Sequence, residues 1–255
     1  MGDLLSDIRF AVRSLARAPG FAAVAVLTLA LGIGANSAIF SVINSVVRKP
    51  LAYPLSDRLM FITSQFPTLG FDKFWVSPPE YFEYRERARS FASMGGYTTG
   101  AMNVSEGDQP ERVNAVFMTA SMWDVLGVVP VAGRTFAEEH DVPNADPVVV
   151  LSHELWQRSF GGDQSVIGKR VEIQGSQRTV LGVMPPGFDL HDAKAQIWAP
   201  LGLDPSNRQN RGSHFLYLVG RLAPGSSEAQ ANADLLTMLR GWREIAAAGH
   251  VPNDS

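Results

Sequence analysis

The glycine-rich segment Gly161–Lys169 is the best candidate in this sequence for a loop that binds phosphate. A Walker A loop has four residues between its outer glycines, and a Ser or Thr after its lysine holds magnesium. Here five residues separate Gly162 from Gly168, and Arg170 follows the lysine. We therefore interpret the segment as an ordinary turn before a strand and expect no nucleotide site in it.

The histidines of the sequence show no metal-ligand spacing. They are His140, His153, His191, His214 and His250. The acidic segment Glu138–Asp141 could hold a cation, but a solvated turn is the better interpretation. We likewise interpret Asp189, His191 and Asp192 as loop residues, and we expect no metal site.

Several enzyme classes are excluded by motifs that the sequence lacks. It contains no G-x-S-x-G, no H-E-x-x-H and no cysteine. Without cysteine there is no thiol catalysis, disulfide, iron–sulfur cluster or Cys-ligated zinc. We expect a protein that is not an enzyme and that carries no cofactor.

The composition limits which other classes of protein the sequence can belong to. The chain has 255 residues, of which 45% are hydrophobic, and its net charge is -3. That is enough apolar material for a packed core. A nucleic-acid-binding protein usually presents a strongly basic face, so the charge argues against a nucleic-acid partner.

The elements that would position any functional residue begin with a long apolar run. No residue from Phe21 to Val47 is charged. A helix of that length would extend roughly 40 Å, and the hydrocarbon core of a membrane is about 30 Å thick. We therefore predict a transmembrane helix over residues 21–47, between an N-terminal segment 1–20 and a domain over 48–255. The alternatives are a buried core helix and a cleaved signal peptide, although acidic residues ahead of the apolar run are untypical of the latter.

Apolar residues recur at three- and four-residue spacing in the segment 1–20. Leu5, Ile8 and Val12 belong to this stripe, which runs from Leu4 to Leu15. The spacing predicts an amphipathic helix, which Pro19-Gly20 would end. We expect it to lie along the membrane surface; packing against another part of the same protein is the alternative.

Polar and small residues interrupt the second half of the apolar run. Ser37, Ser41 and Asn44 follow spacings of four and three and share one face, and the small residues Gly32 and Ala35 lie on the same half of the helix. Small residues let helices approach closely, and Ser and Asn can bond across the contact. We expect this helix to pack against other helices, from another chain or from sequence that follows Ser255. The alternative is that this half protrudes into water.

The segment 48–255 has the patterns of a soluble α+β domain, with helices on one side of an antiparallel or mixed sheet. Strands are expected at Leu59–Gln65, Met94–Val104, Glu111–Met118, Val148–Leu151, Arg170–Ile173, Arg178–Met184 and Phe215–Leu222. Helices are expected from Pro78 to Arg89, from a Thr119 or Ser121 cap to Leu126, from a Ser152 cap to Phe160, and over Ser226–Ala248. The inner face of the last helix is expected to carry Ala229, Ala233, Leu236 and Leu239.

A series of short motifs covers nearly the whole chain in a fixed order. They include Arg13–Phe21, Leu27–Asn36, Arg48–Pro54, Val150–Trp156, Val166–Lys169, Val180–Pro185, Trp198–Leu201 and Gly220–Gly225. In this order they resemble the start of MacB/FtsX-type ABC transporter permeases, especially the acidobacterial duplicated permeases. The first motifs resemble the first transmembrane helix of that family, and the later ones its MacB-like periplasmic core domain.

The resemblance implies a location and a set of partners. It implies a cytoplasmic N-terminus, a bacterial inner-membrane location, and a two-lobed mixed α/β domain in the periplasm. The implied partners are a separate cytoplasmic ABC ATPase, a second permease half or a permease homodimer, and a periplasmic adaptor. In the family three more helices follow the periplasmic domain, so the chain resembles a truncated permease subunit.

The resemblance also implies a mechanical role. ATP binding would draw two ATPase subunits together, and the permease helices would transmit that motion to the periplasmic domains of an efflux or export system. Two other interpretations stay open from the residues alone. One is a single-span, membrane-anchored periplasmic interaction or sensor module without transport, and the other is a secreted domain with an uncleaved leader.

Overall fold

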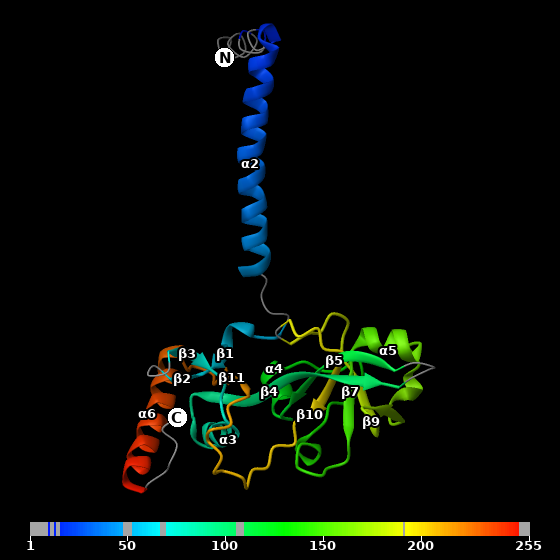
Figure 1. Cartoon of the computed structure of the whole chain (residues 1–255), viewed down its shortest axis with the longest axis vertical. Coiled ribbons are helices and arrows are strands. Elements are labelled where there is room, and N and C mark those ends of the chain that lie inside the picture. The colour runs from blue at the N-terminus through cyan, green and yellow to red at the C-terminus, as the bar shows by residue number, and fades with distance from the viewer. Residues whose placement is uncertain are drawn as a thin grey trace. The chain divides into compact units, whose positions relative to one another are not determined.

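The computed structural model describes Phe10, Arg13 and residues 16–47, 53–66, 70–105, 110–190 and 192–249. The chain forms two compact units, Met1–Leu51 and Ala52–Ser255, and each is described by itself (Figure 1). The expected membrane-surface stripe of Leu5, Ile8 and Val12 lies outside the described residues.

The first unit contains the helix α2, Pro19–Val47, of 29 residues. It begins two residues before the expected start and ends where the apolar run was expected to end. Its part Pro19–Ser37 is long and apolar enough to cross a membrane. None of that window is buried within the chain, so its apolar side chains have no protein core around them.

The second unit is built on a nine-stranded mixed sheet. Its order is β1-β11-β4-β5-β10-β7-β9-β6, and β8 pairs with β4 and β9. The strands are β1 (Leu59–Ile62), β4 (Phe91–Val104), β5 (Glu111–Met118), β6 (Ala132–Gly133), β7 (Val148–Leu151), β8 (Arg170–Ile173), β9 (Ser176–Val183), β10 (Ile197–Pro200) and β11 (Tyr217–Leu222). A separate hairpin is made by β2 (Ser64–Phe66) and β3 (Phe71–Phe74).

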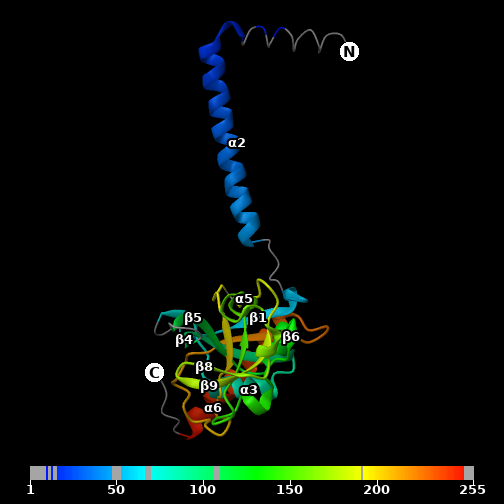
Figure 2. The same cartoon turned by 90° about the vertical axis from the view of Figure 1, so that its right-hand side faces the viewer.

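Four helices lie against this sheet in the described part of the unit. They are α3 (Pro78–Arg87), α4 (Met122–Leu126), α5 (His153–Phe160) and α6 (Glu228–Gly249). Figure 1 shows α5 and α6 at opposite ends of the sheet, and Figure 2 shows the same unit from the side. The first and last strands of the unit, β1 and β11, pair antiparallel, so the chain enters and leaves the sheet side by side.

Local chemistry explains where two of the helices begin. The Ser77 backbone N–H donates to the Glu80 carboxylate at 2.8 Å, which closes the first turn of α3. The Ser152 hydroxyl accepts from the Leu155 N–H at 3.0 Å and caps α5, as its position before the helix predicted. A left-handed Gly161 then ends α5.

The core lies on both faces of β11 and its neighbours. Consecutive strand residues point to opposite faces, and Leu218 packs with α3 and α6 whereas Val219 packs with α4. The helix α4 approaches β4 so closely that a Cβ on Gly95 would lie 2.8 Å from the backbone of Met122. Glycine at that strand position is therefore what allows α4 to rest on the sheet.

Most expected elements are confirmed, and the mixed α/β layout with one N-terminal apolar helix is as expected. The strands β5, β7 and β8 and the end of α5 have the expected bounds. The short strand β10 was not expected, because its four residues end in proline and lack a turn on either side that marks a hairpin. The two lobes implied by the resemblance are not separate compact units, since Ala52–Ser255 cluster together around one sheet.

The expected inner face of α6 is wrong. Of the four residues expected there, Leu236 is 52% exposed, Ala229 and Ala233 are also exposed, and Leu239 is half-buried, whereas Ala231, Leu235 and Met238 are buried. The helix is rotated because Asp234, on its inner side, accepts hydrogen bonds at 3.1 Å from the backbone and the hydroxyl of Ser90. That polar contact, which periodicity does not reveal, fixes which apolar residues turn inward.

Arg221 on β11 joins three parts of the second unit. It is 9% exposed, and its guanidinium donates to the Val125 carbonyl at 2.8 Å, the Pro54 carbonyl at 2.8 Å and the Leu55 carbonyl at 3.0 Å. Val125 lies near the C-terminal end of α4, where free carbonyls favour a cation. Burial, with a smaller contribution from Arg58, lowers the pKa of Arg221 below its usual value. An arginine nevertheless stays protonated in a protein.

A ladder of three ion pairs fastens the connection between β10 and β11 to α3. The three rungs of this α3 ladder are Glu80–His214 at 3.4 Å, Glu86–Arg208 at 2.5 Å, and Glu83–Arg211 between them. The acids are three residues apart on α3, and their partners are three residues apart in the reverse direction. Residues three apart share a side of a helix, so the connection crosses α3 antiparallel to it.

The His214 rung also reaches the β2–β3 hairpin. The His214 ring packs edge-on against Phe66 and Phe74, with ring centroids 5.2 and 5.7 Å apart. Its hydrogen bond to Glu80 raises the pKa of His214 above the usual value, against an opposing effect of burial. The ladder thereby ties α3, the β10–β11 connection and the hairpin together.

We predict that Arg221→Met lowers the free energy of unfolding by about 3–5 kcal/mol, because the buried Val125 carbonyl and the partly buried Pro54 and Leu55 carbonyls lose their donor at once. Arg221→Lys should recover only part of this loss, since an ammonium cannot reach the same fork of acceptors. Urea unfolding of the full chain in nanodiscs measures the free energy of unfolding of both variants. The exposed Arg112→Met is the control and should change stability by less than about 0.5 kcal/mol. An equal effect of the two methionine variants would contradict the role given to Arg221.

We predict that the stability contributed by His214 falls as pH rises. A raised pKa in the folded state means that the contribution is complete below the unfolded pKa of about 6.5 and is lost as pH rises through the folded value. The stability difference between the native chain and His214→Gln should be about 1.5 kcal/mol at the acidic end and shrink toward alkaline pH. Urea unfolding from pH 5.5 to 9 measures it.

The control for this pH effect is Glu80→Gln, which keeps an acceptor for the first turn of α3 but removes the charge that faces His214. In that background the pH dependence contributed by His214 should disappear. Arg211 and Glu83, the next rung, also face this region and remain in every variant. A stability difference that grows with pH would overturn the assignment.

Candidate functional site

The glycine-rich loop is a turn with its own hydrogen bonds. The Asp163 carboxylate accepts from the Ser165 backbone at 2.8 Å, and Lys169 donates to the Ser165 hydroxyl at 2.6 Å. The lysine that would contact a phosphate is therefore bound within the loop, and the strand β8 follows as expected. Within the described residues, no group of three or more His, Cys, Asp or Glu side chains is placed to hold a metal ion.

The acidic turn is more than a solvated loop. The two carboxylate oxygens of Asp141 accept from the backbone N–H groups of Ala120 and Gly202, each at 2.8 Å. Burial raises the pKa of Asp141, and these hydrogen bonds oppose the rise. Asp141 thus joins the start of α4 to the end of β10, a structural role that the sequence pattern did not indicate.

The helix-packing candidates of α2 occupy two faces. Each residue of an α-helix turns by about 100°, which places positions 37, 41 and 44 within about 60° of one another. Gly32 then lies about 180° from Ser41, with Ala35 nearer to Gly32. The small residues and the polar residues therefore form separate stripes, and the side chains of Ser41 and Asn44 are outside the described part.

Gly32 leaves open space beside α2. A Cβ placed on Gly32 or on Gly34 would have no other heavy atom within 4 Å. Gly32, Ala35 and Ser37 are exposed in the single chain. The packing role of these residues stays a prediction, but their surface is available to a neighbouring helix.

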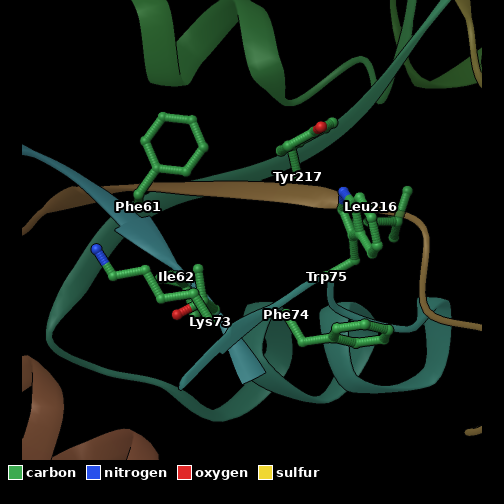
Figure 3. Close-up of a pocket in the computed structure, with 8 residues that line it drawn as sticks. Phe61, Ile62, Lys73, Phe74, Trp75, Leu216 and Tyr217 are labelled. Atoms are coloured by element: carbon green, nitrogen blue, oxygen red, sulfur yellow. The ribbon is translucent and has the colours of Figure 1, made fainter. Parts of the chain in front are cut away.

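The second unit has an apolar pocket at the edge of its sheet, where β1 ends and the chain returns from the hairpin. It encloses about 220 Å³. Its lining residues are Phe61, Ile62, Thr63, Lys73, Phe74, Trp75, Leu216 and Tyr217. Figure 3 shows Phe61 of β1 and Tyr217 of β11 on the same face of the sheet, with Trp75 beside them. We call this the edge pocket.

Aromatic contacts hold the walls of the edge pocket. Trp75 lies edge-on to Phe74, with ring centroids 5.1 Å apart, and to Tyr217 at 6.2 Å. Phe74 in turn contacts Phe66 across the hairpin at 5.4 Å. Such edge-to-face pairs stabilise beyond the burial of their area. The walls are therefore preformed in the chain.

Tyr217 separates the edge pocket from a second hollow of about 400 Å³, which is lined by residues of β4, β5 and the loop before β10. Tyr97 stacks on Tyr217 there, with ring centroids 5.1 Å apart. Burial raises the pKa of Tyr97, and the Tyr97 hydroxyl has no hydrogen-bond partner among the described residues. Burial and Asp189 raise the pKa of the nearby Tyr53 to about 12. Both phenols stay protonated, so they can donate hydrogen bonds but are not bases.

Neither hollow was expected from the sequence. Their residues come from β1, the hairpin, β4, β5 and β11, which are far apart in the chain and meet only in the sheet. The only signal was the density of aromatic residues between Phe66 and Trp75. Aromatic and aliphatic side chains with Thr63 and Lys73 line the edge pocket, and two tyrosines with Thr99 and Asn114 line the second hollow.

Two solved structures share this fold. The periplasmic region of MacB from Actinobacillus actinomycetemcomitans is 18% identical, with a TM-score of 0.54, over 72% of this chain and 82% of that one. A domain of a putative permease protein from Porphyromonas gingivalis is 22% identical, with a TM-score of 0.56, over 74% of this chain and 85% of that one. At these identities the likeness concerns the fold alone. No curated protein sequence matches the chain.

The comparison with family models identifies a family as well as a fold. The model of the MacB-like periplasmic core domain matches residues 22–238. The match begins inside α2 and ends inside α6, so it includes most of the membrane-spanning candidate as well as the sheet. The chain therefore belongs to the MacB-like periplasmic core domain family of ABC-type transporter permeases.

Proposed function

We propose that the chain is a permease subunit of an ABC-type efflux or export system in the bacterial inner membrane. The observation that carries the proposal is the family match over residues 22–238, which joins an apolar helix to the periplasmic core domain in one sequence. In this proposal α2 crosses the membrane, the N-terminal segment is cytoplasmic, and Ala52–Ser255 works in the periplasm.

The family works with an ABC ATPase and as dimeric assemblies in general. We propose the same partners here, namely a separate cytoplasmic ATPase and a second permease, either another copy or another half. The three helices that follow the domain in the resembling permeases would come from further sequence or from another polypeptide. A periplasmic adaptor is a further partner in this proposal.

The proposed work is mechanical. Because β1 follows the segment after α2 and pairs with β11, a displacement of the incoming chain acts directly on the strand that leads to α6. Arg221 strengthens the connection between the incoming segment and β11, since its guanidinium on β11 donates to the carbonyls of Pro54 and Leu55 in that segment. Movement of the membrane part would therefore displace the sheet as a whole.

The two stripes of α2 support a position between neighbouring helices. A helix surrounded by lipid gains nothing from a polar stripe, whereas small and polar residues stabilise helix contacts. We propose that Gly32 and Ala35 contact one neighbour, and that Ser37, Ser41 and Asn44 contact another. Leu5, Ile8 and Val12 are proposed to bind the membrane surface or to couple the ATPase to the helix.

We predict that an ABC ATPase co-purifies with the tagged full chain from membranes, identified by mass spectrometry and by ATP hydrolysis. Replacing Leu5, Ile8 and Val12 together by Asp should reduce its recovery at least tenfold, because the apolar stripe is lost. The control is Ser6→Asp with Ser14→Asp, which adds charge on the opposite side of the expected helix. Absence of any ATPase with the native chain would overturn the proposed function, whereas equal recovery in all variants would overturn only the coupling role.

We predict that Gly32→Ile and Gly34→Ile each weaken association of α2 with its neighbouring helices several-fold. A Cβ at either position meets no heavy atom outside the adjacent backbone of α2 within 4 Å, so a loss reports on a partner. The control Ala22→Ile adds bulk about 80° from Gly32 and should have less than a twofold effect. Energy transfer between labelled chains in native membranes, with any other permease subunit present, measures the association. Equal effects of all three variants would contradict the two-stripe arrangement.

A further inference from the structure

We propose that the edge pocket is an anchor site for a partner protein, and that it takes one large apolar side chain with a carboxylate next to it. The inference rests on the proposed function in one respect, which is that such a partner must share the compartment of Ala52–Ser255. It adds the chemistry of that partner and the place where it binds.

The size of the edge pocket favours a side chain over a transported molecule. Pockets for drug-sized ligands have volumes of about 300–1,000 Å³. The edge pocket encloses about 220 Å³, which is room for a single aromatic or large aliphatic group. Binding between proteins is commonly dominated by such groups inserted into small apolar pockets.

The exposure of the pocket walls shows that they face outward in the single chain. Phe61 is 48% exposed and Trp75 is 42% exposed, although both are large aromatic residues. Aromatic residues are enriched in the centres of protein interfaces, where neighbouring contacts exclude water from them. A partner would cover this surface, since β1 is the last strand of the sheet order and lies at its edge.

The positive charge of Lys73 at the edge pocket favours a partner with an acidic group. Lys73 is the one charged residue among the eight that line the pocket, and it is exposed. Figure 3 shows its side chain extending along the pocket on the side of Phe61. An ammonium at the rim of an interface favours an acidic group on the partner and acts most on specificity. We therefore assign the pocket to a large apolar residue that is adjacent to Asp or Glu.

The pocket is also held in shape before a partner binds. Trp75 is fixed between Phe74 and Tyr217, and Phe74 contacts His214 of the α3 ladder. Groups that are already ordered lose less entropy on binding. The α3 ladder therefore helps to hold the pocket wall in place through the contact between His214 and Phe74.

The experiment measures fluorescence anisotropy of labelled hexapeptides with the full chain in nanodiscs, where no detergent can fill the pocket. One peptide is Gly-Ser-Asp-Trp-Ser-Gly, and the other has Lys in place of Asp, both with blocked ends. We expect saturable binding with at least a fivefold preference for the Asp peptide. Trp75→Ala should weaken binding at least tenfold, and Lys73→Glu should reverse the preference between the peptides.

Phe71→Ala is the matched control. Phe71 is 46% exposed and belongs to the same hairpin, and it contacts Phe74 but does not line the pocket. It should change peptide binding by less than twofold. Circular dichroism melting checks that each variant is folded, and the charge reversal at Lys73 keeps the test valid if Trp75→Ala disturbs the hairpin.

Four results would overturn the proposal. They are absence of saturable binding, an unchanged preference in Lys73→Glu, binding of indole-3-acetate as tightly as the Asp peptide, and peptide-sensitive self-association of the chain. The third would make the site a small-molecule pocket, and the fourth would assign it to a second copy. Loss of peptide binding together with retained ATPase co-purification would remove this inference and leave the proposed function standing.

Discussion

The second unit depends on a buried cation, Arg221, which among the described residues bonds to backbone carbonyls rather than to a carboxylate. The Arg221 guanidinium donates to carbonyls of the incoming segment and of α4 from β11, the last strand of the sheet in chain order. Leu55 is held in a left-handed conformation, with φ of 51°, while its carbonyl accepts from this guanidinium. A non-glycine residue adopts that conformation at a cost, so the bonds from Arg221 help to maintain the geometry of the incoming segment. Without the guanidinium, the incoming segment and the end of α4 would lose the donor on β11 that they share.

Local patterns in the sequence were sufficient for most of the second unit. Val148–Leu151 is an uninterrupted apolar run of three valines and a leucine and forms an inner strand of the sheet. Ser152 caps the helix that follows because its hydroxyl can reach the third residue of that helix. Periodicity failed for α6, where Leu236 was expected inside and is exposed. The inner face of that helix is set by the bond between Asp234 and Ser90, which are distant in the chain. A pattern within one element carries no information on such a contact.

The difference between local patterns and distant contacts also explains which features of the candidate site could be predicted from the sequence. The membrane-spanning candidate was predictable because an uncharged run is a local property, and so were its small and polar residues. The edge pocket was not predictable, because Phe61, Trp75 and Tyr217 meet only after three segments have paired. The α3 ladder has a signal in hindsight, since its acids and bases are each spaced by three residues. When such an acidic series pairs with a basic series in reverse order, the two segments cross antiparallel. The sequence alone does not tell which acidic series pairs with which basic series.

The length of α2 has a consequence for how force could travel. The helix runs without interruption from Pro19 to Val47. At a rise of 1.5 Å per residue the whole helix is about 43 Å long, whereas the hydrocarbon core of a membrane is about 30 Å thick. An unbroken helix of this kind behaves as a lever: a tilt of about 10° at one end shifts the other by roughly 7 Å, more than one helical turn of 5.4 Å. In the proposed permease, small rearrangements among neighbouring helices would be amplified along α2, with no hinge needed inside the helix.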